Sequence, residues 1–494
     1  MPNSMVKIYG YLLYLVLFGV LFISGHMPVL ASKTYPNEKS ILFKNGEQSV
    51  AAFEGTIQVR ENRSNPNSRM IPLTYVRFPA TRKHSGTPII YLAGGPGGSG
   101  ISTASYPGFR FPLFMAMREF GDVIALDQRG TGKSKITPRC ISSQSIPTDK
   151  RLLEKQVMQQ YEAAVKECVD YWNEQGADIL GYTTLESAKD IDQLRKHFGA
   201  QKVSLWGISY GSHLAFASLK VMPDNIDKII IASAEGLNQT VKLPARTDAY
   251  FERLQQAINS QPNAAKAFPN IKQLIQRVHK RLDDSPVLLK LPQDDGQTKE
   301  FLFQRHHMQG LASAMIADPH RFVSRLLQLY SALDHGIFQP LPVLVKRAGL
   351  DQQVISFDMM ALAMDIASGV TDDRLKLVEG QAESSLLGQM LNFPMPQLNR
   401  SIKGLDLGDD FRSYPKSAVP TLLLTGTLDG RTYKESQIEA TQGLTNLTQV
   451  IVKNAGHNLF MVTPEVTQVI QLFMRGEVVK TKQINFELPK FIDD

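Results

Sequence analysis

Short runs that are apolar at nearly every position recur along this chain, each followed by glycine or by a helical pattern. Continuous apolar runs that alternate with helices indicate a mostly parallel sheet buried on both faces. Before them, two alternating segments flank a turn-rich stretch and predict an antiparallel hairpin, residues 55–61 and 71–80. The apolar runs are residues 88–92, 122–127, 202–206, 227–233, 420–426 and 448–454.

The last two runs come late because a long region before them follows a different pattern. Segments in it, such as residues 270–282 and 320–333, space their apolar residues as helices do. The sequence therefore predicts an α/β core in two parts, residues 32–235 and 418–494, separated by a largely helical insertion, residues 236–417.

The N-terminal segment, residues 1–31, has the order of a secretory signal peptide. Lys7 precedes an uncharged apolar run, residues 11–23, and Ala31 places a small residue before a cleavage point. The run is shorter than the roughly 20 residues that span a bilayer, and an uncleaved membrane anchor is the alternative. Either way, we expect the folded part to be exported, to the periplasm or into the medium.

Composition and cysteine count exclude several classes of protein. With 494 residues, 43% of them hydrophobic and 20% charged, the chain has an ordinary globular composition. Its net charge is +7, but Lys and Arg are spread along the chain, so we expect no nucleic-acid partner. The two cysteines, Cys140 and Cys168, suggest one disulfide in an exported protein, with two buried thiols as the alternative. No histidine cluster lies beside either cysteine, so no metal site is expected.

The third apolar run leads into GISYG, residues 207–211, and then into a helical pattern. The order strand, G-x-S-x-G, helix is typical of a sharp, strained turn that exposes a serine hydroxyl above a sheet. Small residues on both sides of the serine let such a turn approach the neighbouring strand and helix. Ser209 is therefore the candidate nucleophile.

A serine nucleophile needs a base, and the base needs a carboxylate that orients it. Asp429 stands just past the fifth apolar run, and His457 stands in the loop after the sixth. Both loops follow the carboxyl ends of strands, where open α/β sheets collect their active sites. We predict a triad of these two residues with Ser209. The rival acids Asp409 and Asp410 do not follow a strand.

A glycine-rich loop, residues 94–100, follows the first apolar run and predicts an oxyanion cradle. Backbone N–H groups in such a loop can point at a developing negative charge. We expect the donors to be the amides of Gly95 and Tyr210, with Gly97 as the alternative to Gly95. Pro96 has no N–H and cannot contribute.

Two local matches to nucleotide-binding motifs are set aside. Residues 95–100 fit G-x-G-x-x-G, but turn residues including Pro107 follow where a helix should begin. Residues 127–134 imitate a phosphate loop, but Asp127 stands where its first glycine must be. We therefore expect no cofactor.

Four segments carry a family resemblance: LAGGPGGSG, VIALDQRGTGKS, YTTLESAKDIDQLR and LWGISYGSHLA. Together they resemble the prolyl aminopeptidase and tripeptidyl aminopeptidase branch of the α/β-hydrolases. The resemblance implies the α/β-hydrolase fold, a mostly parallel sheet with helices on both faces, and makes the helical insertion a cap over the active site. It also implies release of N-terminal residues, proline or short oligopeptides, through an acyl-enzyme on Ser209.

Two departures from the family pattern bear on the substrate. Prolyl iminopeptidases usually carry histidine where this chain has Ala93, and exported tripeptidyl relatives carry more cysteines. Such enzymes hold the free α-amino group of the substrate with carboxylates, which makes Glu235 a candidate for substrate binding. A solvent-facing loop glutamate is the alternative.

The sequence thus predicts an exported serine hydrolase that acts on a peptide or small-molecule substrate, with aminopeptidase activity as the leading hypothesis. A carboxylesterase or other small-molecule hydrolase with the same triad is one alternative. An α/β-hydrolase scaffold used only for binding is another. No contact with a membrane is expected beyond the signal segment.

Overall fold

The computed structural model describes residues 33–83, 86–106, 110–152, 154–293, 296–460 and 462–492. The chain divides into two units, Met1–Thr34 and Tyr35–Asp494, and the elements below belong to the second. The predicted signal peptide, residues 1–31, lies outside the described residues. No helix in the described ranges is long and apolar enough to cross a bilayer.

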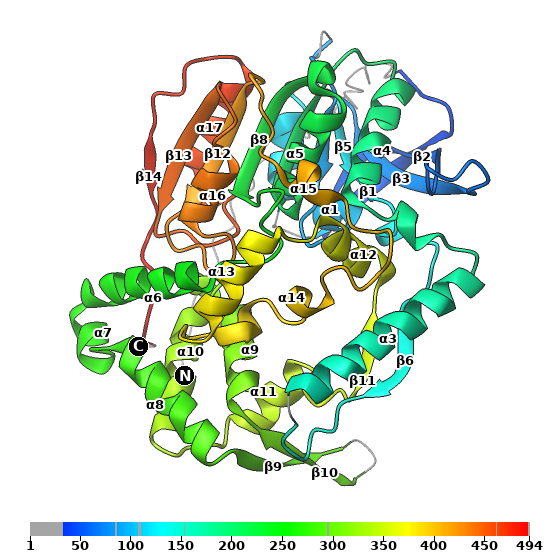
Figure 1. Ribbon diagram of the computed structural model, residues 1–494. Helices are drawn as coiled ribbons and strands as arrows, with labels where there is room; N and C mark the ends of the chain where they lie inside the picture. The colour runs from blue at the N-terminus through cyan, green and yellow to red at the C-terminus, as the bar shows by residue number, and fades with distance from the viewer. Residues whose placement is uncertain are drawn as a thin grey trace, which may run out of the picture. The chain divides into compact units, whose positions relative to one another are not determined.

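A ten-stranded sheet, counted over the described residues, runs from blue to red in Figure 1 in the order β1-β2-β3-β5-β4-β7-β8-β12-β13-β14. Strands β1 to β5 pair antiparallel along this order, and β5 through β14 pair parallel. The predicted hairpin is β2–β3, and the six apolar runs are β4, β5, β7, β8, β12 and β13. The strands are β1 Glu38–Asn45, β2 Gln48–Arg60, β3 Met70–Phe78, β4 Ile89–Leu92, β5 Val123–Leu126, β7 Val203–Ser209, β8 Ile226–Ala234, β12 Thr421–Gly426, β13 Leu447–Lys453 and β14 Gln483–Asn485.

Helices cover both faces of this sheet, which explains why its strands are apolar at every position. In β4, Ile90 and Leu92 enter the core beneath α4 and α5, whereas Ile89 and Tyr91 enter the core beneath α1, α2 and α17. The predicted α/β-hydrolase architecture is therefore confirmed. The covering helices are α1 Gly100–Ser105, α2 Phe111–Met117, α4 Thr184–His197, α5 Tyr210–Val221, α16 Lys434–Ala440 and α17 Pro464–Met474.

A mainly helical region separates β8, which ends at Ala234, from β12, which begins at Thr421. Helices α6, α8, α9 and α10 build a core of their own with the hairpin β9–β10, while α12 packs into the core of the sheet. The elements are α6 Pro244–Asn259, α7 Pro262–Ala267, α8 Ile271–Asp284, β9 Val287–Pro292, β10 Thr298–Phe303, α9 Arg305–Met315, α10 Pro319–Asp334, α11 Leu341–Arg347, β11 Val354–Phe357, α12 Met359–Ser368, α13 Asp372–Ala382, α14 Met395–Leu398 and α15 Gly408–Arg412. Short 3-10 helices are η1 Gly132–Ser134, η2 Ile179–Gly181, η3 Pro223–Asn225 and η4 Gly388–Leu391.

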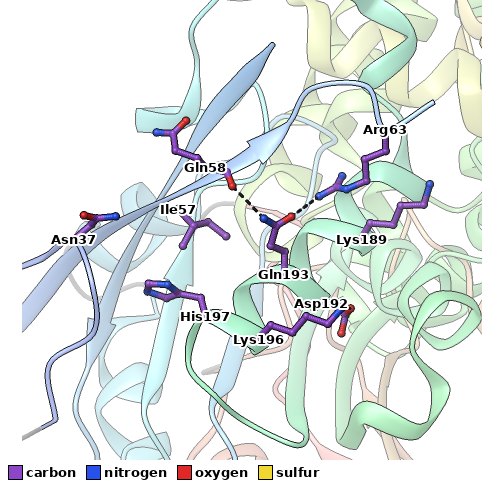
Figure 2. Close-up of a pocket in the computed structure, with 9 residues that line it drawn as sticks. All are labelled: Asn37, Ile57, Gln58, Arg63, Lys189, Asp192, Gln193, Lys196 and His197. Carbon is purple, nitrogen blue, oxygen red and sulfur yellow. Dashed lines mark hydrogen bonds and ion pairs between the residues drawn. The ribbon is translucent and has the colours of Figure 1, made fainter. Parts of the chain in front are cut away.

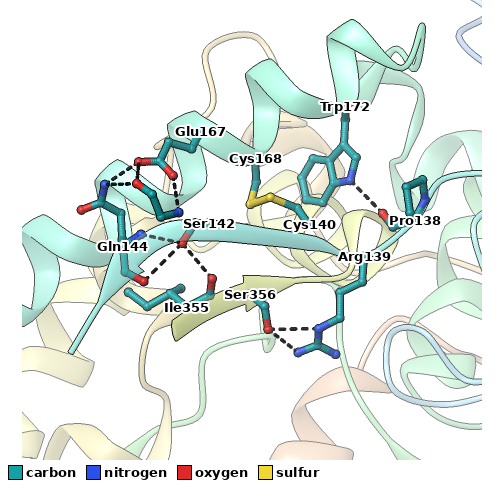
Figure 3. Close-up of a disulfide and its surroundings, with 11 residues drawn as sticks. Pro138, Arg139, Cys140, Ser142, Gln144, Glu167, Cys168, Trp172, Ile355 and Ser356 are labelled. Atoms are coloured by element: carbon teal, nitrogen blue, oxygen red, sulfur yellow. Dashed lines mark hydrogen bonds between the residues drawn. A yellow bond between two sulfur atoms is a disulfide. The ribbon is translucent and has the colours of Figure 1, made fainter. Parts of the chain in front are cut away.

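A second excursion from the sheet was not predicted from the sequence. Between β5 and α4 the chain forms β6 Cys140–Ser145 and the long helix α3 Glu154–Glu174, and β6 pairs antiparallel with β11 of the helical region. Figure 3 shows the disulfide that joins Cys140 of β6 to Cys168 of α3, with their Cα atoms 5.6 Å apart. The pairing of β6 with β11 could not be predicted from local sequence patterns, because the two strands are more than 200 residues apart.

Candidate active site

Ser209 ends β7 in a backbone conformation that serine rarely adopts, with φ 55° and ψ −128°. Both glycines of the turn are required by close contacts. A Cβ at Gly207 would lie 2.6 Å from the carbonyl oxygen of Gly211, and one at Gly211 would lie 2.1 Å from that of Leu92. Such strain persists only where the surroundings enforce it, and it is typical of functional turns.

Asp429 and His457 lie in contact in the loops after β12 and β13. The Nδ1 atom of His457 is 3.1 Å from each carboxylate oxygen of Asp429, which is fully buried. Because an ionised carboxylate only accepts hydrogen bonds, Nδ1 carries the proton of the neutral ring and Nε2 keeps its lone pair. The ring is thereby prepared to act as a base through Nε2.

Neighbouring donors, which the sequence analysis missed, stabilise the charge of Asp429. Its oxygens accept hydrogen bonds from the Thr432 hydroxyl at 2.7 Å and from the amides of Arg431 and Thr432 at 2.8 Å. Burial by itself would raise the pKa of Asp429, but His457 and these hydrogen bonds hold that pKa below its ordinary value. The signal was present in the sequence, because an aspartate followed directly by glycine is typical of a turn closed by the aspartate side chain.

The rival acids lie elsewhere. Asp409 forms an ion pair with Arg412 at 2.8 Å, and the backbone carbonyl of Asp410 accepts a hydrogen bond from Lys220. Both belong to α15. Of these acids, only Asp429 contacts His457.

Ser209 and the His457 loop meet at the same edge of the sheet. The hydroxyl of Ser233 donates to the His457 carbonyl at 2.7 Å, and the next residue, Ala234, is the cross-strand partner of Ser209. Over the described residues, neither the Ser209 hydroxyl nor His457 Nε2 has a hydrogen-bond partner. Catalytic hydrogen bonds of this kind commonly tighten only when substrate binds.

The glycine-rich loop lies directly against the serine turn. A Cβ at Gly94 would be 3.1 Å from the Ile208 carbonyl oxygen and 3.3 Å from the Ser209 Cβ. Gly95 has φ 129°, a region that favours glycine. The loop is closed by a hydrogen bond from the Gly98 amide to the Gly94 carbonyl at 3.0 Å.

The two expected oxyanion donors have amides that are not engaged elsewhere. Within the described ranges, no hydrogen bond is formed by the backbone N–H of Gly95 or of Tyr210. Tyr210 is the first residue of α5, where backbone N–H groups have no partner inside the helix. The alternative donor, Gly97, has φ 107° and faces Ala361 of α12, since its Cβ would lie 3.6 Å from that of Ala361.

Glu235 is buried, with 5% of its surface exposed, and is not a solvent-facing loop residue. It follows β8, its amide donates to the Ser212 hydroxyl at 2.8 Å, and its carboxylate lies 3.3 Å from the ammonium of Lys242. Glu235 thus contacts α5 at Ser212, about one helical turn after the candidate nucleophile Ser209.

A second carboxylate, Asp365 of α12, belongs to the same region and was missed by sequence reasoning. Burial, and then the nearby charge of Glu235, raise the pKa of Asp365 to about 7. Along α12 only Ala361 and Asp365 are not fully buried. These residues are four apart and share one face of the helix, the face that borders Gly97.

A surface hollow of about 710 Å³ lies apart from these residues, beside β2 and α4 (Figure 2). Its cations already have partners: Arg63 is bonded to Glu186 and Gln193, and Lys196 is paired with Asp192. None of the predicted site residues, all of which the structure describes, lines it. The described residues also contain no group of three or more His, Cys, Asp or Glu arranged to hold a metal.

Comparison with known proteins agrees with the architecture. Residues 87–314 match the family described as alpha/beta hydrolase fold. The chain is similar to the serine protease Hip1 of Mycobacterium tuberculosis, with 29% identity over 194 residues, 37% of this chain and 36% of that protein. It therefore spans about a third of the length of this relative.

Two further relatives are named as exopeptidases. The tripeptidyl aminopeptidase of Streptomyces coelicolor is 25% identical over 36% of this chain and 34% of its own length. The proline iminopeptidase of Arabidopsis thaliana is 22% identical over 60% of this chain and 64% of its own length. The chain is thus similar to the alpha/beta hydrolase fold family over residues 87–314, and to proteins named tripeptidyl aminopeptidase and proline iminopeptidase.

Proposed function

We propose that this protein is a serine aminopeptidase that releases N-terminal residues from peptides. The observation that carries the proposal is the strained Ser209 turn at the same sheet edge as the hydrogen-bonded pair His457–Asp429. A serine, an imidazole and a buried carboxylate in this arrangement are the groups that acyl transfer requires.

In the first half of the reaction the Ser209 hydroxyl attacks the substrate carbonyl and His457 Nε2 takes the hydroxyl proton. Asp429 stabilises the imidazolium, and the amides of Gly95 and Tyr210 bind the oxyanion of the tetrahedral intermediate. The intermediate collapses as His457 returns the proton to the leaving amine. The products are the free amine and an ester between the substrate acyl group and Ser209.

Water completes the cycle by the same route. His457 Nε2 removes a proton from water as the oxygen attacks the ester carbonyl, and the same two amides hold the second oxyanion. Collapse returns the proton to the Ser209 oxygen and releases the carboxylic acid.

Two carboxylates support specificity for a free amino terminus. Glu235 and Asp365 both border the region of Ser209, and only one cation, Lys242, forms an ion pair with either of them among the described residues. Lys242 pairs with Glu235, whereas no ion pair of Asp365 is found among the described residues, although the charges of Lys242 and Arg431 act on it. An α-ammonium group would pair with the ionised Asp365 carboxylate, which is favourable because buried charge is costly unless paired.

We further propose that the protein acts outside the cytoplasm. The order of residues 1–31 and the disulfide between Cys140 and Cys168 support export, since disulfides persist in oxidising compartments.

The proposal is tested with three substrates on the purified protein: an alanyl or prolyl anilide with a free amine, its N-acetylated form, and a short-chain nitrophenyl ester. We expect cleavage of the free-amine anilide, little of the acetylated one, and a loss of about 1,000-fold or more in kcat for Ser209→Ala. Ser218→Ala is the matched control, because Ser218 lies on α5, the helix that follows Ser209, and its hydroxyl donates to the Leu214 carbonyl at 2.8 Å.

The other outcomes contradict parts of the proposal. Ester turnover without cleavage of either anilide would make the protein a carboxylesterase with the same triad. Full activity in Ser209→Ala would remove the serine mechanism, and no serine-dependent turnover of any substrate would leave a binding scaffold.

A further inference from the structure

Asp127 is a buried acid that the mechanism above does not use. It stands directly after β5, next to the strand that leads into the glycine-rich loop, and its side chain is 0% exposed. Burial raises the pKa of Asp127, opposed by its hydrogen bonds. A carboxyl group kept in such a place has a cost that its contacts must offset.

The contacts of Asp127 join two loops. One oxygen, Oδ1, accepts hydrogen bonds from the Ser99 hydroxyl at 2.5 Å and the Ile101 amide at 3.0 Å. The other, Oδ2, accepts from the Lys133 amide at 2.8 Å. Ser99 and Ile101 lie at the C-terminal end of the glycine-rich loop, and Lys133 lies in the turn after β5, so one carboxylate joins the two loops.

The turn at Gly132 approaches the Asp127 carboxylate so closely that only glycine fits at this position. A Cβ at Gly132 would lie 2.1 Å from Asp127 Oδ2 and 2.8 Å from the Ser99 hydroxyl oxygen. Gly132 also has φ 45°, which favours glycine. The turn therefore wraps the carboxylate without a side chain between them.

The next residue holds the other end of the same loop. Gln128 is buried, and its Nε2 donates to the Ala93 carbonyl at 3.1 Å, one residue before Gly94. Asp127 and Gln128 together thus fix both ends of the segment 93–101, which contains the candidate oxyanion donor Gly95. The segment has glycine at five positions between these ends, residues 94, 95, 97, 98 and 100, and glycine has no side chain that could hold it in place.

We propose that Asp127 is a positioning residue for catalysis, which holds the glycine-rich loop against the Ser209 turn so that the Gly95 amide meets the oxyanion. This inference rests on the proposed function, because it assigns Asp127 a role in the same acyl transfer. An oxyanion donor acts only at the correct distance, so loosening the loop affects the transition state more than the bound substrate.

The test is Asp127→Asn in the full-length protein. An asparagine offers one acceptor oxygen, and its NH2 group would face a hydrogen-bond donor on one side. We expect kcat to fall by about 10- to 100-fold with KM changed less than about twofold, for both the ester and the free-amine anilide. The affinity of an alkylboronic acid, which forms a tetrahedral adduct on serine, should fall by a similar factor.

The matched control is Asp122→Asn at the opposite end of β5. Asp122 accepts hydrogen bonds from Arg77 at 2.9 Å and from the Ala80 amide at 2.8 Å, far along the strand from the loop. Both variants lose a buried or half-buried carboxylate, so both should melt at lower temperature. Only Asp127→Asn should lose kcat and boronate affinity when activity is expressed per folded molecule.

A second variant keeps the test decisive if Asp127→Asn does not fold. Ser99→Ala removes one of the three hydrogen bonds to Asp127 and should lower kcat by about 3- to 10-fold. Equal kcat losses in Asp127→Asn, or in Ser99→Ala, and in Asp122→Asn would overturn the positioning role. Such a result with an inactive Ser209→Ala would refute this inference alone, whereas an active Ser209→Ala would refute the proposed function.

Discussion

Asp429 shows how much one side chain depends on the backbone around it. Its carboxylate faces the His457 ring on one side and the amides of its own turn on the other. Gln437, buried within the following helix α16, adds a hydrogen bond at 3.4 Å. The loop after β12 therefore holds the carboxylate that faces the histidine ring in both position and charge.

We expect Asp429→Asn to lower kcat by about 1,000- to 10,000-fold, because an amide in this place favours the wrong tautomer of His457. Steady-state kinetics with the ester would measure it. Asp410→Asn is the matched control, since Asp410 is the acid that the sequence offers as a rival, and it should change kcat by less than about twofold. Comparable losses in the two variants would show that Asp429 is not the orienting acid.

At the scale of elements, the turn between α9 and α10 packs on the two loops that carry the proposed acid and histidine. A Cβ at Gly430 would lie 2.3 Å from the Ile316 carbonyl oxygen, and one at Gly456 would lie 2.5 Å from the Pro319 ring. The His457 amide also donates to the Ala317 carbonyl at 2.9 Å. The helical region therefore supports the acid and the histidine, in addition to bordering the oxyanion loop through α12.

Helix α12 gives a prediction about pH. Asp365 has its pKa raised to about 7 by burial and by Glu235, with the cations Lys242 and Arg431 acting in the opposite direction. Its carboxylate is thus mostly protonated at pH 6 and mostly ionised at pH 7.5. If both acids bind the substrate ammonium, KM for the free-amine anilide should fall by about 5- to 10-fold over that range.

The ester provides the internal reference for this measurement. It carries no ammonium group, so its KM should not follow Asp365, while any titration of the triad affects both substrates. Asp365→Asn should raise KM for the anilide and remove the pH dependence. Asp358→Asn, at the exposed start of the same helix, should do neither. A ratio of the two KM values that stays constant from pH 6 to 7.5 would contradict the role of Asp365.

The strands and the Ser209 turn were predictable because their signals are local: apolar runs, and glycines two residues either side of a serine. The place of Asp365 near the candidate site was not predictable, because it depends on which face of α12 borders Gly97. The helix itself is apolar on nearly all sides. The contact of the α9–α10 turn with Gly430 and Gly456 is likewise set only by tertiary packing.

At the scale of the whole molecule, the excursion between β5 and α4 is joined to the helical region. Strand β6 pairs with β11, and Arg139 bonds both Ser356 and Asp358 just before α12 (Figure 3 shows Ser356). The disulfide between Cys140 and Cys168 closes this excursion onto α3. A segment that supports α12 is therefore held by a covalent bond.

We expect replacing both cysteines by serine to lower the free energy of unfolding by about 3.5 kcal/mol. The reason is that the unfolded chain is no longer restricted by a link between residues separated by 28 positions. Urea unfolding would measure the shift in midpoint.

Because Cys140 is 3% exposed and Cys168 0% exposed, a mild reductant should leave the bond intact in the folded protein and break it only under unfolding conditions, as thiol titration would show. At low urea the double variant should keep kcat and KM for the ester within about twofold, since neither cysteine lies in the proposed site. An unchanged urea midpoint would mean that contacts such as β6–β11 hold the excursion without the disulfide. A large loss of kcat in the folded variant would instead mean that the excursion positions α12 for catalysis.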